Sequence, residues 1–222
     1  MMFTVSTFAK VVISAVDQQK SNYHHGNLPD TLLEYAIAVL NEAGVEGLSL
    51  REVARRAGVS HSAAYRHYAD KKSMLAAVAV WGFSELHDRI RSQIGPFSGA
   101  PRTRLFAAVR AYVAFGQTYP HLLRVMFGDL PHSEFPELQA AARRTFDLLL
   151  DILAEGQQQG MIVEGDLRRI TLAVWAAFHG LTEILNAEKI PYQQPAAHYQ
   201  EQLVRSTLEL LMRGISLRKE TE

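Results

Sequence analysis

The 222-residue chain contains no cysteine. This absence excludes disulfide frameworks, thiolate metal sites and cysteine nucleophiles, and it fits a reducing compartment. The chain also has no net charge, because 23 basic residues balance 23 acidic ones. A surface that attracts nucleic acid everywhere is therefore not expected, and any contact with nucleic acid must be confined to one region.

Long hydrophobic runs are missing as well. No segment approaches the roughly 20 apolar residues that a membrane-spanning helix needs. The apolar stretch near the N-terminus, residues 3–16, is interrupted by Lys10, and the remaining run 11–16 is too short for the core of a signal peptide. We interpret residues 1–20 as an N-terminal extension and expect a soluble, cytoplasmic protein with no membrane partner.

Motifs that would carry catalysis are also missing. The sequence has no glycine-rich phosphate loop, no nucleophile elbow, no His-Glu-x-x-His run and no paired-carboxylate arrangement. Residue types that bind metals occur in two sets, His179 with Glu183 and the group Asp129, His132, Glu134 and Glu137. The pair lacks a third ligand nearby in sequence, and the acids of the group lie in a loop and a helix start, where the helix dipole favours acids anyway. We therefore predict that the protein is not an enzyme and that it has no cofactor and no metal site.

What the sequence does contain is helical periodicity, with apolar residues three and four apart almost everywhere and no sustained alternation. Asn27-Leu28-Pro29 predicts the start of a first helix that stops at Gly44. Three further helices are predicted from Ser49 to Gly58, from His61 to about Tyr68, and from Lys71 onward, and five more follow Gly95-Pro96. The chain is therefore predicted to be all-α, with about nine helices.

Apolar stripes predict which faces of the later helices are buried. One helix carries Leu105, Val109, Tyr112 and Gly116, and a later one carries Leu138, Ala142, Phe146, Leu149 and Leu153. The eighth carries Ile170, Val174, Phe178, Leu181 and Leu185, and the last carries Leu203, Thr207, Leu211 and Ile215. Because the last helix has two adjacent apolar columns, we expect a homodimer that forms through about residues 166–186 and 198–216.

Positive charge is concentrated in one short segment. Between Arg51 and Lys72, six basic residues stand against Glu52 and Asp70, which gives +4, whereas residues 1–50 sum to −3 and the remaining 150 residues to about −1. Lys71 and Lys72 fall in the first turn of a helix, where the dipole disfavours cations by a few tenths of a kcal/mol. A phosphate group bound there would explain that placement.

The same segment has the pattern of a helix-turn-helix. Ser49 and Glu52 form a capping box, and Ser60 caps the next helix. Gly58 lies at the turn, where a positive φ favours glycine. The small apolar hub consists of Val53, Ala54, Ala57, Val59 and Ala64. The alternatives are an ordinary helical hairpin with an incidental basic face, and a helical enzyme whose basic patch binds a phosphorylated substrate.

The stretch from Leu50 to Leu75 resembles the DNA-binding signature of the TetR/AcrR family of repressors, and Tyr23–Leu28 also resembles that family. The resemblance implies a three-helix DNA-binding domain (residues 21–70), followed by a larger helical domain for ligand binding and dimerisation (residues 71–218). By position it also implies the residues that contact DNA. Tyr65, His67 and Lys71 would hold phosphates, and Arg51 would contact the backbone or a base edge. His61, Ser62 and Ala63 would face bases. The remaining predicted DNA-binding residues are Ser60 and Arg66.

One departure from that family pattern concerns the first recognition positions, which more often include glycine or threonine. With serine and alanine at these positions, base reading is expected to depend on methyl contacts, water and DNA shape.

The C-terminal half resembles a TetR subgroup named for a Trp-His-Gly signature, through Tyr119–Phe127 and Trp175–Gly180. Trp175 and His179 are either the wall of an effector pocket with one polar anchor, or a core tryptophan beside a histidine bonded to Glu183. The candidate ligand-lining residues, each of which could also be plain core, are Tyr112, Phe115, Met126, Phe127, Phe146, Trp175 and His179.

The function predicted from these features is that of a DNA-binding transcriptional regulator. We expect a homodimeric repressor that a small, largely apolar ligand releases from a palindromic operator. The alternative is a ligand-independent DNA-binding regulator whose C-terminal domain only dimerises.

Overall fold

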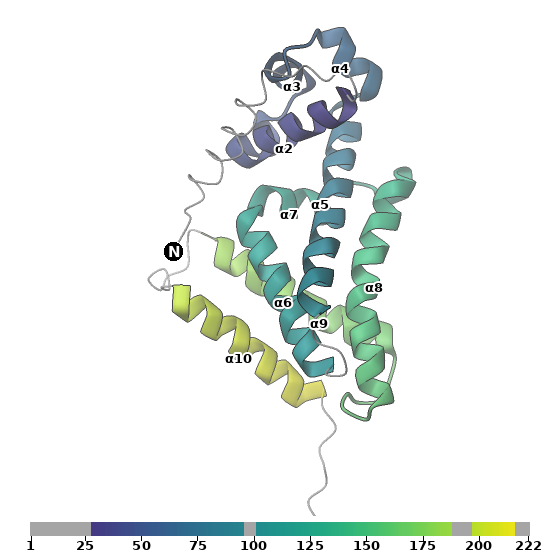
Figure 1. The fold of residues 1–222 in the computed structure, drawn as a ribbon, viewed down its shortest axis with the longest axis vertical. Helices are drawn as coiled ribbons and strands as arrows, with labels where there is room; N and C mark the ends of the chain where they lie inside the picture. Colours follow the sequence, from purple (N-terminus) through teal and green to yellow (C-terminus); the bar gives the residue numbers. More distant parts are fainter. Residues whose placement is uncertain (1–27, 96–100, 188–196, 216–222) are drawn as a thin grey trace, which may run out of the picture. The chain divides into compact units, whose positions relative to one another are not determined.

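The computed structural model describes residues 28–95, 101–187 and 197–215, and within these ranges the chain is helical without any strand (Figure 1). This confirms the all-α class. The expected extension 1–20 lies outside the described residues. The helices are α2 (Leu28–Gly47), α3 (Leu50–Arg56), α4 (His61–His67), α5 (Lys71–Ile94), α6 (Pro101–Thr118), α7 (Pro120–Phe127), the short 3₁₀ helix η2 (His132–Glu134), α8 (Pro136–Gln158), α9 (Leu167–Asn186) and α10 (Ala197–Ile215).

The chain forms two compact units. The first contains residues up to Ala79 together with His121–Leu130, and the second contains Val80–Pro120 and the residues from Pro131 onward. Helix α5 therefore begins in the first unit and continues into the second. Within the described ranges, no helix has both the length and the apolar character needed to cross a membrane.

The first unit is organised around α2, which packs against α3, while α3 packs against α4. The predicted stop of the first helix is visible at Gly44, whose φ of 66° interrupts the regular helix. The imidazole of His121, on α7, lies 3.4 Å from where a Cβ on Gly44 would be. Glycine therefore serves two needs at this position, the positive φ and the close approach of α7.

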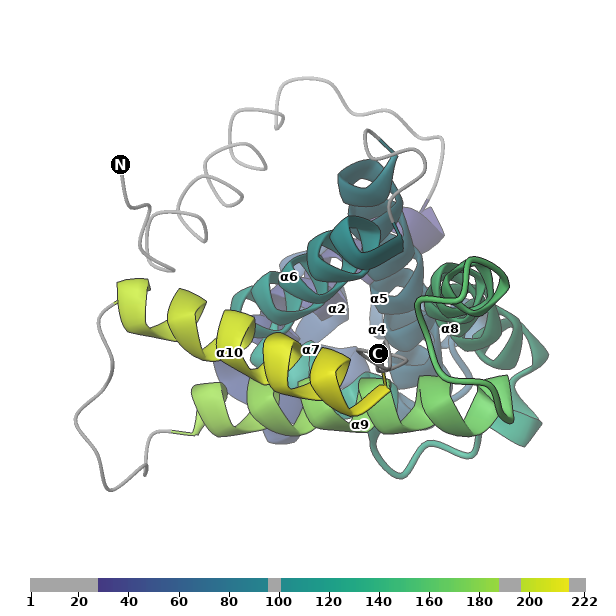
Figure 2. The same ribbon diagram turned by 90° about the horizontal axis from the view of Figure 1, so that it is seen from below.

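In the second unit, α6 is the central helix and packs against α8, α9 and α10. Its predicted stripe of Leu105, Val109, Tyr112 and Gly116 is buried, as expected. Helices α9 and α10 also contact each other, and Figure 2 shows them lying next to one another.

The predicted stripe of α8 is wrong in its middle. Leu138 and Leu153 are buried, but Ala142, Phe146 and Leu149 are only half-buried. The buried positions between the two ends are Ala141, Thr145 and Ile152. Thr145 can be buried because its hydroxyl donates to the carbonyl oxygens of Phe83 and Ala141, at 3.0 Å each. Apolar periodicity misses such a position, since threonine counts as polar in the pattern.

The stripes predicted for α9 and α10 also need correction. On α9, Val174 and Phe178 are buried as expected, whereas Ile170, Leu181 and Leu185 are half-buried; Thr171 and Thr182 complete the buried face. On α10, the buried residues are Val204, Leu208 and Met212. The predicted column, Leu203, Thr207, Leu211 and Ile215, is only half-buried. Both helices carry adjacent apolar columns, and only the tertiary packing selects which column faces the core.

Candidate functional site

Helices α3 and α4 form the predicted helix-turn-helix. The Ser49 hydroxyl caps α3 by accepting from the Glu52 N–H at 3.1 Å. At the turn, Gly58 has a φ of 69°, and no atom lies within 4 Å of where its Cβ would be. The positive φ, and not lack of space, therefore favours glycine there. The Val59 N–H closes the turn by donating to the Ala54 carbonyl at 3.0 Å.

The start of α4 is fixed by Ser60, whose hydroxyl accepts from the Ala63 N–H at 3.2 Å and lies 3.0 Å from the Ser62 hydroxyl. Ala64 is fully buried and anchors the helix in the hub. The opposite face of α4 is exposed. Of the predicted DNA-contacting residues, Arg51, Ser60, His61, Ser62, Tyr65, Arg66 and His67 are exposed, and Ala63 and Lys71 are half-buried.

Tyr65 is unusual for an aromatic residue, since 52 % of it is exposed. Its ring packs edge-on against His61, with the ring centres 5.6 Å apart. These two predicted DNA-contacting residues, one turn apart, therefore form a joint exposed surface on α4. An exposed tyrosine that offers both a ring and a hydroxyl suits contact with a sugar–phosphate backbone.

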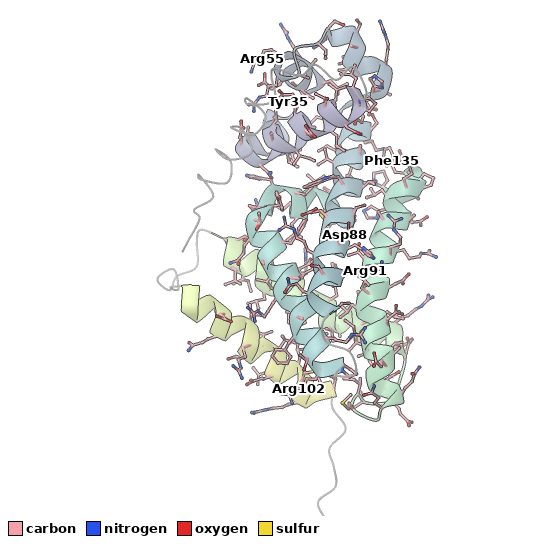
Figure 3. The ribbon with its side chains drawn as sticks, in the orientation of Figure 1. Tyr35, Arg55, Asp88, Arg91, Arg102 and Phe135 are labelled. Atoms are coloured by element: carbon pink, nitrogen blue, oxygen red, sulfur yellow. The ribbon has the colours of Figure 1, made fainter. Side chains whose placement is uncertain are left out.

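The two arginines at the end of α3 contact carboxylates of the protein itself. Glu52 accepts from Arg55 at 2.7 and 2.8 Å and from Arg56 at 2.7 Å, and Arg56 also donates to Glu42 of α2 at 2.6 Å. The hydrogen bonds from Arg55 and then from Arg56 lower the pKa of Glu52 to about 2. The surplus of +4 is thus unevenly distributed: Arg51 and Arg66 are exposed on the surface, whereas Arg55, labelled in Figure 3, and Arg56 belong to an ion-pair network.

Lys71 has a structural partner that the sequence did not reveal. Its ammonium group donates to the Val45 carbonyl oxygen at 2.6 Å, beside the interruption of α2. Asp70 and Ser73 cap the same helix start reciprocally, with N–H bonds of 2.7 and 3.1 Å. The Val45 carbonyl offsets part of the unfavourable placement of a lysine in the first turn. An ammonium group has three donors, so this bond and a phosphate contact are compatible.

The candidate effector residues are distributed over both units. Met126 and Phe127 lie on α7 in the first unit, with Met126 fully buried and Phe127 half-buried. In the second unit, Phe115 packs against Tyr119 and Arg89, with centre distances of 5.3 and 5.8 Å, and Phe146 is half-buried on α8. The remaining three, Tyr112, Trp175 and His179, come together between α6 and α9.

Tyr112, Trp175 and His179, together with Glu183, form a polar cluster. The Tyr112 hydroxyl lies 2.8 Å from His179 Nδ1, and the rings of Trp175 and His179 are stacked 5.1 Å apart at 21°. Burial raises the pKa of Tyr112 and lowers that of His179, while Glu183 raises both. Sequence reasoning considered only Glu183 as the histidine's partner and missed Tyr112, which is 67 residues away.

Comparison with known proteins gives matches over most of the chain. Residues 32–78 match the family model described as bacterial regulatory proteins of the tetR family, and residues 105–209 match the model of a tetracyclin repressor-like C-terminal domain. The class A tetracycline repressor from transposon 1721 of Escherichia coli is 41 % identical over 59 residues, which is 27 % of each chain.

Two solved structures extend the comparison. A protein of unknown function from Rhodococcus sp. RHA1 is 34 % identical, with a TM-score of 0.78 and coverage of 89 % of this chain and 100 % of that one. The transcriptional regulator FadR from Bacillus subtilis, solved in complex with stearoyl-CoA, has a TM-score of 0.67 over 84 % of this chain and 98 % of its own. At 20 % identity, the FadR match supports the fold alone.

Proposed function

The chain belongs to the TetR family of DNA-binding transcriptional regulators, and we propose that it is a homodimeric repressor that a small, largely apolar ligand releases from a palindromic operator. The observation that carries the proposal is the exposed face of α4, where capped helix ends hold His61, Ser62 and Tyr65 outward. Arg51 and Arg66 add exposed positive charge to the same helix-turn-helix. Side chains of these types are suited to contact phosphates and base edges in a major groove.

The proposed dimer is supported by large apolar side chains that α9 and α10 expose. Leu172 and Ile184 are 54 % and 56 % exposed, and Leu210 on α10 is 67 % exposed. Between Leu172 and Ile184, the outer side of α9 carries Ala173, Ala176 and Gly180, which would let a partner helix approach closely. A twofold contact of α9 and α10 with their copies forms a four-helix arrangement and covers these residues.

A dimer is also what operator recognition requires. One recognition helix contacts too few base pairs for specificity, whereas two related by a twofold axis read half-sites about 34–36 Å apart. The operator is therefore proposed to be palindromic. Selection of bound duplexes from a random pool tests this directly: a recovered palindrome supports the dimer, and recovery of only asymmetric or random sequences contradicts it.

The dimer surface can be tested by placing charge on it. Leu210→Glu puts a carboxylate in the proposed interface, so we expect the dimer to dissociate to monomers and operator affinity to fall by more than about 100-fold. Gln139→Glu, at an exposed position on α8, adds the same charge elsewhere and should leave both unchanged. Analytical ultracentrifugation with gel shift measures both quantities, and a Leu210→Glu protein that remains dimeric contradicts the proposed interface.

Ligand control is proposed to act through α5, which begins in the DNA-binding unit and continues into the second unit. A ligand that displaces α5 would change the separation of the recognition helices. By linkage, the two affinities change by the same factor, typically about 5–150-fold: the ligand weakens DNA binding by this factor, and it binds the DNA-bound dimer more weakly than the free dimer by the same factor. The FadR protein, which has this fold, was solved in complex with stearoyl-CoA, and the stearoyl chain of that ligand is apolar.

The second candidate is a ligand-independent regulator, in which the second unit only dimerises. The hydrogen-bonded packing of Tyr112 and His179 is equally compatible with a plain core. Footprinting of the selected operator with and without small-molecule extracts separates the two. Protection that is lost with an extract supports ligand control, and protection that survives every extract favours the second candidate.

A further inference from the structure

We propose that the effector is an uncharged molecule with an apolar body and one hydrogen-bonding oxygen, and that Tyr112 and His179 bind this oxygen. The inference rests on the ligand control proposed above and adds the chemical class of the ligand. It follows from the geometry of the polar cluster between α6 and α9 and from the distribution of charge in the second unit.

The cluster gathers hydrogen-bonding aromatic side chains between α6 and α9. Tyr112 is only 7 % exposed, whereas Trp175 and His179 are half-buried. The Tyr112 hydroxyl and His179 Nδ1 are 2.8 Å apart, and Trp175 stacks on His179 one turn along α9. Small-molecule sites typically combine apolar and aromatic walls with a few polar groups of this kind. A ligand oxygen can join or replace the hydrogen bond between Tyr112 and His179 without leaving a buried polar atom unpaired.

Both hydrogen-bonding groups stay uncharged near neutral pH. Burial holds the pKa of Tyr112 well above its ordinary value, against a lowering hydrogen bond from Trp175. Burial also holds the pKa of His179 below its ordinary value, although the Glu183 carboxylate acts in the opposite direction. Neutral donors and acceptors match a hydroxyl or carbonyl, whereas a charged ligand group would lose its hydration, and neither Tyr112 nor His179 offers a charge to offset that loss. Only a cation would meet an opposite charge, on Glu183, so an amine is the charged probe that tests the proposed class most severely.

The charge inventory of the second unit disfavours an anion in particular. Of its arginine and lysine side chains in the described ranges, only Arg89 and Arg104 are half-buried, and the others are exposed. Arg89 is paired with Glu85 at 2.6 Å, and Arg104 is paired with Glu155. A carboxylate bound at the cluster would therefore face the negative field of Glu183, while both half-buried cations of the unit are already paired with carboxylates.

The test uses probes that differ only in their polar group. On a decyl chain these are decanol, decanoate and decylammonium, and a second series uses the alcohol, carboxylic acid and amine of 4-tert-butylcyclohexane. The full-length protein carries Trp81→Phe, so that Trp175 is the one remaining tryptophan of two and its fluorescence reports binding at the cluster. Release of the selected operator is followed in parallel by gel shift.

We expect the alcohol of at least one series to bind at least about tenfold more tightly than its carboxylate and amine, and to release DNA. Tyr112→Phe keeps the ring and removes the hydroxyl, so it should weaken the alcohol about tenfold. Tyr119→Phe is the control, because Tyr119 follows the last residue of α6 and its hydroxyl accepts from Arg89 at 3.4 Å. This variant should leave alcohol affinity unchanged. Glu183→Gln should strengthen the carboxylate severalfold without affecting the alcohol.

Distinct results overturn the ligand class and the ligand control. If the carboxylate or the amine binds most tightly and releases DNA, the proposed class is wrong while ligand control holds. The class is also wrong if Tyr112→Phe, with an unchanged melting temperature, binds the alcohol as the parent does. If no probe of any class binds or releases DNA, both this inference and the ligand control are contradicted.

Discussion

In the first unit, Ser60, Arg51 and Arg66 of the helix-turn-helix are exposed, and the starts of the helices that carry them are held by bonds between residues three or four apart, such as that from the Ala63 N–H to Ser60. In the second unit, Tyr112 and His179 are 67 residues apart in the sequence and meet between α6 and α9, where Tyr112 is buried and His179 is half-buried. A surface held by local bonds keeps its geometry when the packing behind it shifts. A buried cluster formed by long-range packing changes whenever its helices move, and this suits an effector site better than a DNA-reading surface.

The largest effect is expected from removal of the exposed positive charge of the first unit. Arg51→Ala with Arg66→Ala should weaken operator binding by at least about 100-fold and lower the salt slope by about 2. Both residues are exposed, so the melting temperature should hardly change. Gel shift over a salt series measures both. Arg143→Ala with Arg144→Ala, exposed on α8 of the second unit and outside the proposed dimer surface, is the matched control, and an equal loss there would show that overall charge, not the α3–α4 face, determines affinity.

The next, smaller effect compares the two units at two glycines that share the same backbone conformation. Gly58 and Gly160 have φ values of 69° and 66°, and neither has an atom within 4 Å of the place that a Cβ would take. Alanine at either position should cost about 1 kcal/mol of unfolding free energy through backbone strain. Only Gly58→Ala should also weaken operator binding, by severalfold, because it tilts α4. Urea unfolding measures the loss of stability, and gel shift measures operator affinity, for both variants. A DNA-binding defect in Gly160→Ala would contradict the expected difference between the two units.

The pH dependence of stability should depend on His179, the half-buried histidine of the polar cluster. The pKa of His179 is lowered in the fold from an ordinary 6.5, so the unfolded chain binds more protons below that pH. Stability should be complete above about pH 6.5 and decline as the pH falls through the lowered folded value. His179→Gln should flatten this decline in melting temperature between pH 7.5 and 5.5 by a few degrees, whereas His61→Gln, exposed on α4, serves as the control.

The smallest effect is expected from the ion-pair network of the first unit. Glu52→Gln removes the carboxylate that binds Arg55 and Arg56, so the Arg55 guanidinium group gains freedom to contact DNA, while Arg56 keeps its ion pair with Glu42. Non-specific binding should rise severalfold and its salt slope should steepen by about 1. Glu137→Gln, at an exposed position in the second unit, changes the net charge equally and should have little effect. No difference between the two variants would show that the network does not restrain Arg55.

The order of the helices and the helix-turn-helix were predictable because their signals are local. Ser49, Gly58 and Ser60 act on backbone atoms within four residues, so the spacing of residue types suffices. The pairing of Glu52 with Arg55 and Arg56 has the helical three- and four-residue spacing, but the sequence analysis assigned Glu52 only to the capping box and did not predict these ion pairs. The bond from Lys71 to Val45 and the approach of His121 to Gly44 were not predictable from spacing, since each joins segments separated by long stretches of chain.

Within the second unit, the sequence by itself determined that the chain is helical and that its helices are amphipathic. It did not determine which apolar column of α8 or α10 is buried, because adjacent columns satisfy the same periodicity. Only the tertiary structure decided that Thr145 lies inside, where it bonds Phe83, and that Tyr112 is the partner of His179. Helix formation is governed by neighbours along the chain, whereas burial and long-range hydrogen bonds depend on which helices pack together.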